Sequence, residues 1–352
     1  MVATRRAGHS SSSEGRRTCG FFTAARVLLD APRFPSDPDD TVLDRNDAVV
    51  LLRSDHLDAI EDAAGELTAL PFWRPTSIRR GFAGGGFDGG PSLPKQMALA
   101  AGVPGAGLIP DKAELFLGFT SSQKAGLGPR RIANIETLGY SDGGAGGYFL
   151  RGTTMHLSHL FEDLEKWYGT PFFKRGDQAF RPGIASRTDT ADILTFPPHN
   201  KDLGPATVAN NRSDHALRGA IGHAASLQPA TRLQRAVRGR DGTLYKKGTA
   251  VPQRADFNTL DNPFFWSATP EHDGMKTEPA AGLHFVVFHP TSDDFHRSRL
   301  AMDGVFPDGT KLRLQPRAKG QGLNSVLRTT HRQNFIVPPR RHRSFPLVEL
   351  LA

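Results

Sequence analysis

A lone histidine sits among small residues in GHAASLQPATR, which spans residues 222–232. A neutral imidazole is a common metal ligand, and small neighbours such as Ala224 and Ala225 let a flat macrocycle lie close to it. His223 is therefore a candidate cofactor ligand, and a structural histidine held by ordinary hydrogen bonds is the alternative. His215, in SDHALRG eight residues earlier, is a rival for the same role.

A second candidate is Arg254, which stands in PQRADFNTLDNPFF at residues 252–265. Arginine stays charged and donates through a planar fork, so it can stabilise negative charge that develops in a reaction. Asp256 and Asn258 follow closely enough to orient the guanidinium. A salt bridge within an ordinary loop is the alternative interpretation.

The stretch HFVVFHPTSDDFH, at residues 284–296, is rich in groups that can bind a metal ion. Side chains alternate between the two faces of a strand, so His284 and His289 point to opposite sides, which disfavours a shared metal ion. Asp293 or Asp294 can instead hydrogen-bond a ligand histidine and raise its basicity.

Composition limits the classes of protein that these residues can belong to. The chain has 352 residues and a net charge of +8, and 38% of its residues are hydrophobic, as in a globular protein with a large core. The basic residues are scattered and no nucleic-acid-binding motif accompanies them, so we expect no nucleic-acid partner. The single Cys19 excludes an internal disulfide and a cysteine-based zinc cage. No apolar run approaches the ~18 residues of a membrane-spanning helix, so we expect no membrane insertion.

The first 44 residues are predicted to be a disordered or atypical segment. They contain arginine pairs, a serine run and a short apolar patch. A twin-arginine export signal needs an uninterrupted apolar region after Arg16 and Arg17, and Arg26 interrupts it. Export by that route stays open, and the cytoplasm is the default assignment because the sequence does not determine the compartment.

Strand–helix units recur along the chain and must position the candidate residues. Apolar runs predict strands at 48–52, 148–157 and 282–290, each followed by a helix whose predicted caps are Asp55, Ser158 and Ser292. Further elements are a buried strand at 113–123, a hairpin at 238–249 with Asp241 and Gly242 at its tip, and a last strand at 334–339. In MHLSH, His156 and His159 are predicted at a strand end and in the first turn of a helix.

These elements predict an α+β fold of two ferredoxin-like units with antiparallel sheets, of the dimeric α+β barrel type. The first unit is expected to be incomplete, because no convincing strand and helix precede residue 45. The predicted halves are residues 45–169 and 170–352, and the second carries His223. No Gly-x-Gly-x-x-Gly motif opens a helix after a strand, which argues against dinucleotide binding.

Four stretches resemble the dye-decolorizing (Dyp-type) peroxidase superfamily, whose members are haem proteins built from two ferredoxin-like halves. They are DAVVLLRSDHLDAIEDA, ELFLGFTSSQ, GHAASLQPATR, and GLHFVVFHP together with NFIVPP. The resemblance covers roughly residues 45–350, and its motifs are short and degenerate.

The resemblance implies a role for each candidate. His223 would be the axial iron ligand of haem b, and Arg254 would stabilise the negative charge that develops as the O–O bond of peroxide breaks. Phe119, in the GFTSSQ loop, would contact the haem. Arg328, in the basic cluster of residues 325–345, would meet the haem propionates, with a solvated basic surface as the alternative.

One loop departs from the family pattern. The family's Gly-x-x-Asp-Gly loop carries an aspartate that shuttles the peroxide proton, and Ser121 and Ser122 stand here where the aspartate and second glycine would be. A hydroxyl has no accessible pKa for acid–base work near neutrality. Ser121 would then position a water, and Asp256 would substitute as the base.

The implied function is therefore a haem-dependent peroxidase that oxidises organic substrates with hydrogen peroxide. A homo-oligomer is a further expectation. Two alternatives remain open at this point. One is a haem-binding carrier or sensor without turnover, and the other is a scaffold that has lost haem.

Overall fold

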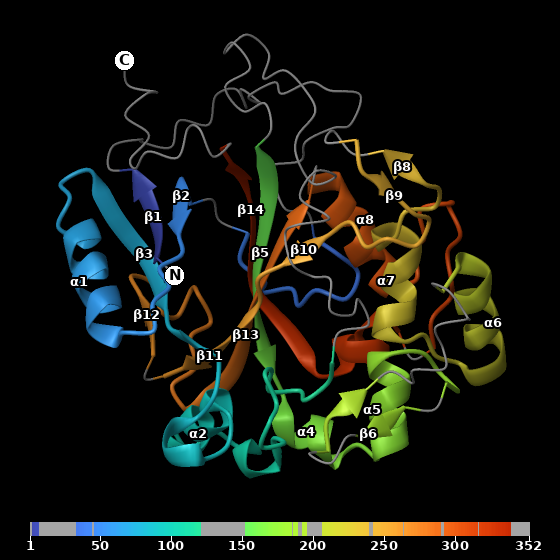
Figure 1. The fold of residues 1–352 in the computed structure, drawn as a ribbon, viewed down its shortest axis with the longest axis horizontal. Coiled ribbons are helices and arrows are strands. Elements are labelled where there is room, and N and C mark those ends of the chain that lie inside the picture. Colours follow the sequence, from blue (N-terminus) through green and yellow to red (C-terminus); the bar gives the residue numbers. More distant parts are fainter. Residues whose placement is uncertain are drawn as a thin grey trace, which may run out of the picture.

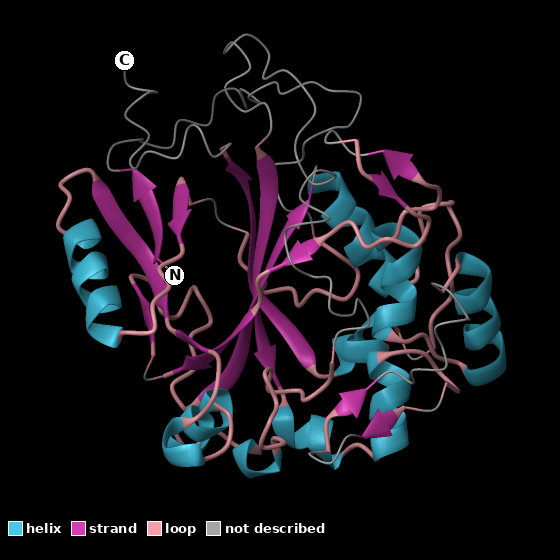
Figure 2. Ribbon diagram, in the orientation of Figure 1, coloured by secondary structure: helices cyan, strands magenta, loops and turns pink. Residues whose placement is uncertain are grey.

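The computed structural model describes residues 2–6, 33–43, 46–120, 152–184, 186–188, 192–195, 206–238, 242–262, 264–289, 292–315 and 317–338. It contains two main antiparallel sheets and a group of helices (Figures 1 and 2). This architecture agrees with the predicted mixture of helices and antiparallel strands.

The smaller of the two main sheets has the strand order β12-β3-β1-β2. Its strands are β1 (Val2–Arg6), β2 (Ala48–Val50), β3 (Trp73–Arg79) and β12 (Phe265–Ser267). Helix α1 (Leu57–Thr68) lies along its outer side in Figure 1. The strand at β2 and the helix at α1 were predicted, whereas β1 falls in the segment for which no regular structure was predicted.

The larger sheet positions the candidate site. Its order is β14-β5-β13-β11-β4, and β10 also pairs with β13. The strands are β4 (Gly81–Phe82), β5 (Thr153–Glu162), β10 (Gln253–Arg254), β11 (Phe257–Asp261), β13 (Ala280–His289) and β14 (Leu327–Val337). Because β5 pairs with β13 and β14, strands from both predicted halves share this sheet, and the division at residue 169 stays a prediction.

Helices gather beside the larger sheet, on the right in Figure 1. They are α4 (Leu164–Gly169), α5 (Phe172–Ala179), α6 (Val208–Arg218), α7 (His223–Thr231) and α8 (Ser292–Met302), with α2 (Leu93–Ala100) below the sheets. Two short hairpins, β6–β7 (Arg187–Thr188, Leu194–Thr195) and β8–β9 (Val237–Arg238, Leu244–Tyr245), complete the ordered elements. A core of large buried side chains joins them, including Phe116, Leu164, Trp167, Phe180 and Leu260.

The prediction around MHLSH is wrong. Strand β5 continues to Glu162, so His156 and His159 are both buried strand residues rather than surface or cap positions. Ser158 lies within the strand, and the helix begins after Asp163, whose carboxylate accepts a hydrogen bond from the Lys166 N–H at 3.0 Å. Leucines at 157, 160 and 164 imitate helical spacing, but pairing on both sides of β5 selects the extended backbone.

Other elements divide into confirmed and corrected predictions. The core strand at 282–290 and the hairpin near Gly242 are confirmed as β13 and β8–β9. The last strand is longer than predicted, because β14 begins at Leu327. Residues 113–118 form turns rather than a strand, and Phe119 makes an isolated bridge to Leu194.

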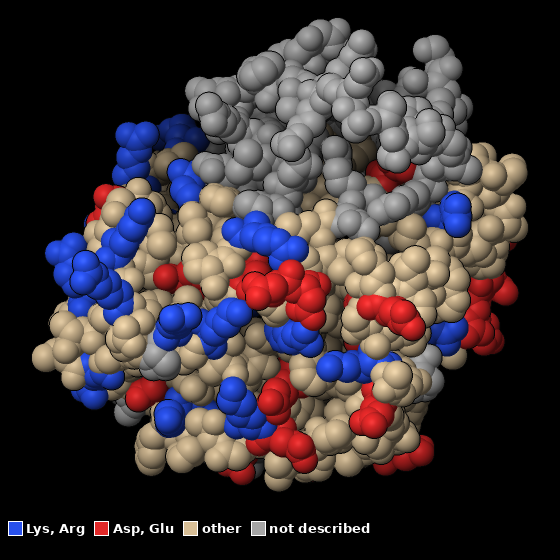
Figure 3. Space-filling model, turned by 180° about the vertical axis from the view of Figure 1, so that it is seen from behind, with Lys and Arg blue, Asp and Glu red and all other residues tan. Residues whose placement is uncertain are grey.

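Charged side chains of both signs interleave over the face drawn in Figure 3. That distribution agrees with scattered basic residues rather than a single basic stripe. Within the part of the chain that the structure describes, no helix combines the length and apolar character needed to cross a bilayer.

Candidate functional site

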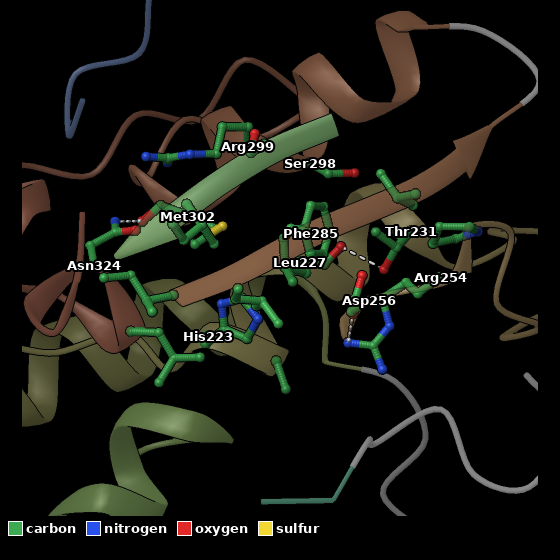
Figure 4. A pocket seen from close by; sticks show the side chains of 18 of the residues that line it. His223, Leu227, Thr231, Arg254, Asp256, Phe285, Ser298, Arg299, Met302 and Asn324 are labelled. Atoms are coloured by element: carbon green, nitrogen blue, oxygen red, sulfur yellow. Dashed lines mark hydrogen bonds and ion pairs between the residues drawn. The ribbon is translucent and has the colours of Figure 1, made fainter. Parts of the chain in front are cut away.

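A cavity with about 1460 Å³ of empty space, its open mouth included, lies on one face of the larger sheet beside α7 and α8 (Figure 4). Alternate strand residues form its floor because their side chains share a face. These are Ser158, Leu160 and Glu162 from β5, and Leu283, Phe285, Val287 and His289 from β13. Helix α7 contributes His223, Ala224, Leu227, Gln228 and Thr231, and α8 contributes Phe295, Ser298, Arg299 and Met302.

His223 is the first residue of α7, so the start of this helix fixes where the imidazole lies. A Cβ at the preceding Gly222 would clash with the Phe180 carbonyl and would lie 2.8 Å from the Asp177 carbonyl oxygen, which is also too close. Only glycine therefore lets the chain approach α5 this closely before the helix begins.

The imidazole of His223 has no hydrogen-bond partner among the described residues, and its Nδ1 atom is fully buried. Burial, together with the positive charges of Arg254 and Arg299, lowers the pKa of His223 to about 3. The ring is consequently neutral at physiological pH, so one of its nitrogen atoms has a lone pair that can bind a metal ion.

Arg254 and Asp256 lie two residues apart, at the end of β10 and just before β11, and both side chains line the cavity. Arg254 Nη1 lies 3.6 Å from Asp256 Oδ2, and Figure 4 shows the two groups facing each other. Asp256 Oδ1 accepts a hydrogen bond from the Val286 N–H at 3.1 Å.

The environment of Asp256 moves the pKa of its carboxyl group towards neutral pH. Burial raises the pKa of this carboxyl to about 6, against the opposing effects of Arg254 and the Val286 N–H. A carboxyl with such a pKa exchanges a proton readily near pH 6 to 7, as a general acid–base group must.

Asn258 does not orient Arg254 as the sequence suggested. It is fully buried, and its Oδ1 accepts a hydrogen bond from the Phe116 N–H at 2.9 Å. Its Nδ2 donates to the Glu114 carbonyl at 2.7 Å. Asn258 therefore ties the 113–117 turns to β11 and supports the cavity wall from behind.

The remaining predicted residues have different locations. Phe119 lines the cavity, with its ring edge-on to Phe180 at 6.2 Å between centroids. Arg328 is not among the lining residues, because its half-exposed side chain pairs with Asp40. His215 lies on α6, away from the lining residues, and Ser121 falls outside the described residues.

Four further charged residues line the same cavity, and sequence reasoning gave none of them a role of its own: Glu162, Arg232, Arg299 and Arg332. Arg332 donates to Asp37 Oδ2 at 2.6 Å, and Arg299 donates to Asp303 Oδ1 at 2.9 Å. Both guanidinium groups are therefore neutralised in place. Glu162 has no such partner among the described residues and is treated below.

The opposite face of the sheet borders a smaller cavity with about 500 Å³ of empty space, its open mouth included, which β2 and β3 also line. His284 lines this smaller cavity and His289 lines the larger one, in agreement with their predicted opposite directions. Among the described residues, no cluster of three or more potential ligands is arranged to hold a metal ion. The side chains of Asp293 and Asp294 lie outside the described set.

Comparison with solved structures finds Dyp-type peroxidases at low similarity. A putative Dyp-type peroxidase from Shewanella oneidensis is 15% identical, with a TM-score of 0.45 over 90% of this chain and 74% of that one. The encapsulated DyP-type peroxidase from Mycobacterium smegmatis is 13% identical, with a TM-score of 0.42 over 89% and 75%. DyPB from Rhodococcus jostii RHA1 is 12% identical, with a TM-score of 0.35, and the match covers 65% of this chain and about half (53%) of that one. At these values the likeness assigns no role to any residue of this chain.

Sequence comparison gives a different kind of result. No curated protein matches significantly. A family model, described as a family of unknown function (DUF7405), matches residues 74–339, which include β4 to β14 and the cavity residues His223, Arg254 and Asp256. The chain is a member of the DUF7405 family.

Proposed function

We propose that this protein is a haem-dependent peroxidase, a divergent relative of the Dyp-type enzymes, that oxidises an organic reductant with hydrogen peroxide. One observation carries the proposal. A neutral, unpartnered imidazole faces a large, mostly apolar cavity that also holds a paired arginine and carboxyl group. We further propose that the chain consists of two ferredoxin-like units, residues 45–169 and 170–352, and that each unit contributes strands to both sheets.

The residues present fit a haem b group. His223 has a buried ring nitrogen without a partner, which is what an axial ligand must offer before iron binds. The small side chain of Ala224 and the apolar side chains of Leu227 and Phe119 give the neighbouring wall a character suited to a porphyrin ring. Bound haem would supply the redox chemistry of iron towards peroxide.

Arg254 and Asp256 would act on the peroxide. The guanidinium of Arg254 holds a fixed positive charge where an oxygen gains negative charge, and such a preorganised donor needs no rearrangement during the reaction. The carboxyl of Asp256, with its pKa near 6, would accept a proton from the peroxide hydroxyl and return it to the departing oxygen. These roles put the acid–base group beside the arginine rather than at Ser121.

The test is to titrate haem into the purified chain and then to follow dye oxidation with and without hydrogen peroxide. We expect a Soret band and peroxide-dependent turnover. Arg254→Leu should keep the band and lower kcat/KM by about 10²- to 10³-fold, and Arg254→Lys should restore part of the loss. A Soret band without turnover would identify a carrier or sensor, and no Soret band would identify a haem-free scaffold.

A further inference from the structure

Glu162 is the last residue of β5, and its side chain lines the same cavity as His223. The residue is only 3% exposed. Neither carboxyl oxygen has a hydrogen-bond or ion-pair partner among the described residues, and Oε2 is fully buried. Burying a polar group without a partner is unfavourable, so such a group in a native structure requires an explanation.

The surroundings of Glu162 are apolar. Its partner across the strand pair is Leu327, and Leu160 precedes it on the same face of β5. Phe119 and Phe180, packed edge to face, line the same cavity. Tyr168 is near enough for the charge of Glu162 to affect its pKa, but its hydroxyl donates to the Phe116 carbonyl instead.

Among the residues that the structure describes, no cation pairs with Glu162. The cavity is lined by four arginines, at positions 232, 254, 299 and 332, yet burial alone accounts for the pKa of Glu162, which it raises to about 8. The carboxyl is therefore protonated and neutral at pH 7, and a cation that enters the cavity would stabilise its ionised form.

We propose that the part of the cavity at Glu162 binds the amino group of an organic amine whose body is apolar and aromatic. The ammonium group provides both a positive charge and hydrogen-bond donors, neither of which the described residues offer to Glu162. The side chains of Leu160, Phe119 and Phe180 contact the aromatic part of the ligand. Phe119 and Phe180 already pack edge to face, and a further aromatic ring can pack against them in the same way. An alcohol of the same shape carries no charge, so it gains no ion pair with Glu162 and leaves the carboxyl protonated.

This proposal deepens the proposed function, and it rests on that function only in identifying the amine with the organic reductant. Binding itself has a defined proton balance. The free site holds a neutral carboxylic acid and the free ligand is an ammonium ion, whereas the complex holds a carboxylate and an ammonium ion. One proton therefore passes to the solvent for each amine bound near pH 7.

The experiment is isothermal titration calorimetry of phenethylamine into the full chain, in two buffers with different heats of ionisation. The variants are Glu162→Gln and, as a matched control, Glu165→Gln, an exposed carboxylate three residues further on. We expect release of about one proton and similar affinity in the unmodified chain and in Glu165→Gln. Glu162→Gln should release no proton and bind about tenfold more weakly or worse.

A second comparison does not depend on any variant folding correctly. Phenethyl alcohol should bind the unmodified chain at least about tenfold more weakly than phenethylamine. Equal binding of the two probes, no binding of phenethylamine, or unchanged proton release in Glu162→Gln would overturn the proposal.

Repeating the titration after haem addition separates this proposal from the proposed function. If the chain shows no Soret band but binds the amine through Glu162, the proposed peroxidase function is wrong and the amine site is supported. If the haem-loaded chain turns over peroxide but shows neither the effect of Glu162→Gln nor the preference for the amine over the alcohol, the peroxidase function is supported and the amine site is wrong.

Discussion

The two faces of the larger sheet bury charged groups in different ways. On the face towards β2 and β3, Arg79 pairs with Asp261 at 3.0 Å and His331 pairs with Asp273 at 3.0 Å. On the face towards α7 and α8, Arg299 and Arg332 are also paired, but Glu162 has no counterion among the described residues. Paired groups of the first kind hold structure together, whereas an unpaired group of the second kind costs stability and is best explained by a ligand.

The largest expected effect concerns the pH dependence of stability at Glu162. Its folded-state pKa of about 8 lies above the ordinary value of 4.5, so the folded protein keeps a proton that the unfolded chain has already lost. Stability is therefore lost as the pH rises from about 4.5 to about 8. Relative to Glu162→Gln, the unmodified chain should lose roughly 5 kcal/mol of unfolding free energy over that range, measured by urea denaturation.

Equal pH profiles for the two proteins would show that Glu162 is paired in solution, and the contrast between the faces would disappear. Glu165→Gln serves again as the exposed control, and its profile should follow that of the unmodified chain.

The opposite face should respond to loss of a partner. Asp261→Asn leaves the guanidinium of Arg79 buried without its countercharge, which should cost about 3 to 5 kcal/mol of unfolding free energy. The half-exposed pair of Arg80 and Glu61 is the control, and Glu61→Gln should change stability by no more than about 1 kcal/mol. A similar small loss in both variants would mean that the buried pair has no structural role.

The position of His223 depends on close backbone packing at Gly222. Gly222→Ala places a methyl group against the carbonyls of Phe180 and Asp177, and we expect a loss of about 1 to 3 kcal/mol together with weaker haem binding. Gly65→Ala, within α1 and with nothing near its would-be Cβ, should instead stabilise the chain by roughly 0.5 to 1 kcal/mol. Both values can be read from thermal unfolding.

The smallest effect is expected at Arg328. Its exposed pair with Asp40 contributes little, so Arg328→Met should change stability by less than about 1 kcal/mol. Haem affinity should also be unchanged, because this side chain does not line the cavity. A marked loss of haem affinity would restore the role that the sequence suggested for Arg328.

Local patterns predicted part of this arrangement. The apolar run of β13 was enough to predict a buried strand. The spacing of Arg254 and Asp256 was enough to predict that they lie together, because residues two apart on an extended chain share a side. The same alternation placed His284 and His289 correctly on opposite faces.

Strand β5 was not predicted over its full length, because it is buried on both faces. Neither face of this strand is solvated, so no polar alternation marks it, and its leucines match helical spacing equally well. The burial of Glu162 depends on strand partners more than 100 residues away in the sequence, which no local pattern reports.

The central claim is that His223 binds the iron of haem, and absorbance after haem addition tests it most directly. The unmodified chain and His215→Ala should show the same Soret band, because His215 lies on α6 outside the cavity lining. His223→Ala should lose the band while unfolding at a similar temperature. A Soret band that survives in His223→Ala and disappears in His215→Ala would contradict the account.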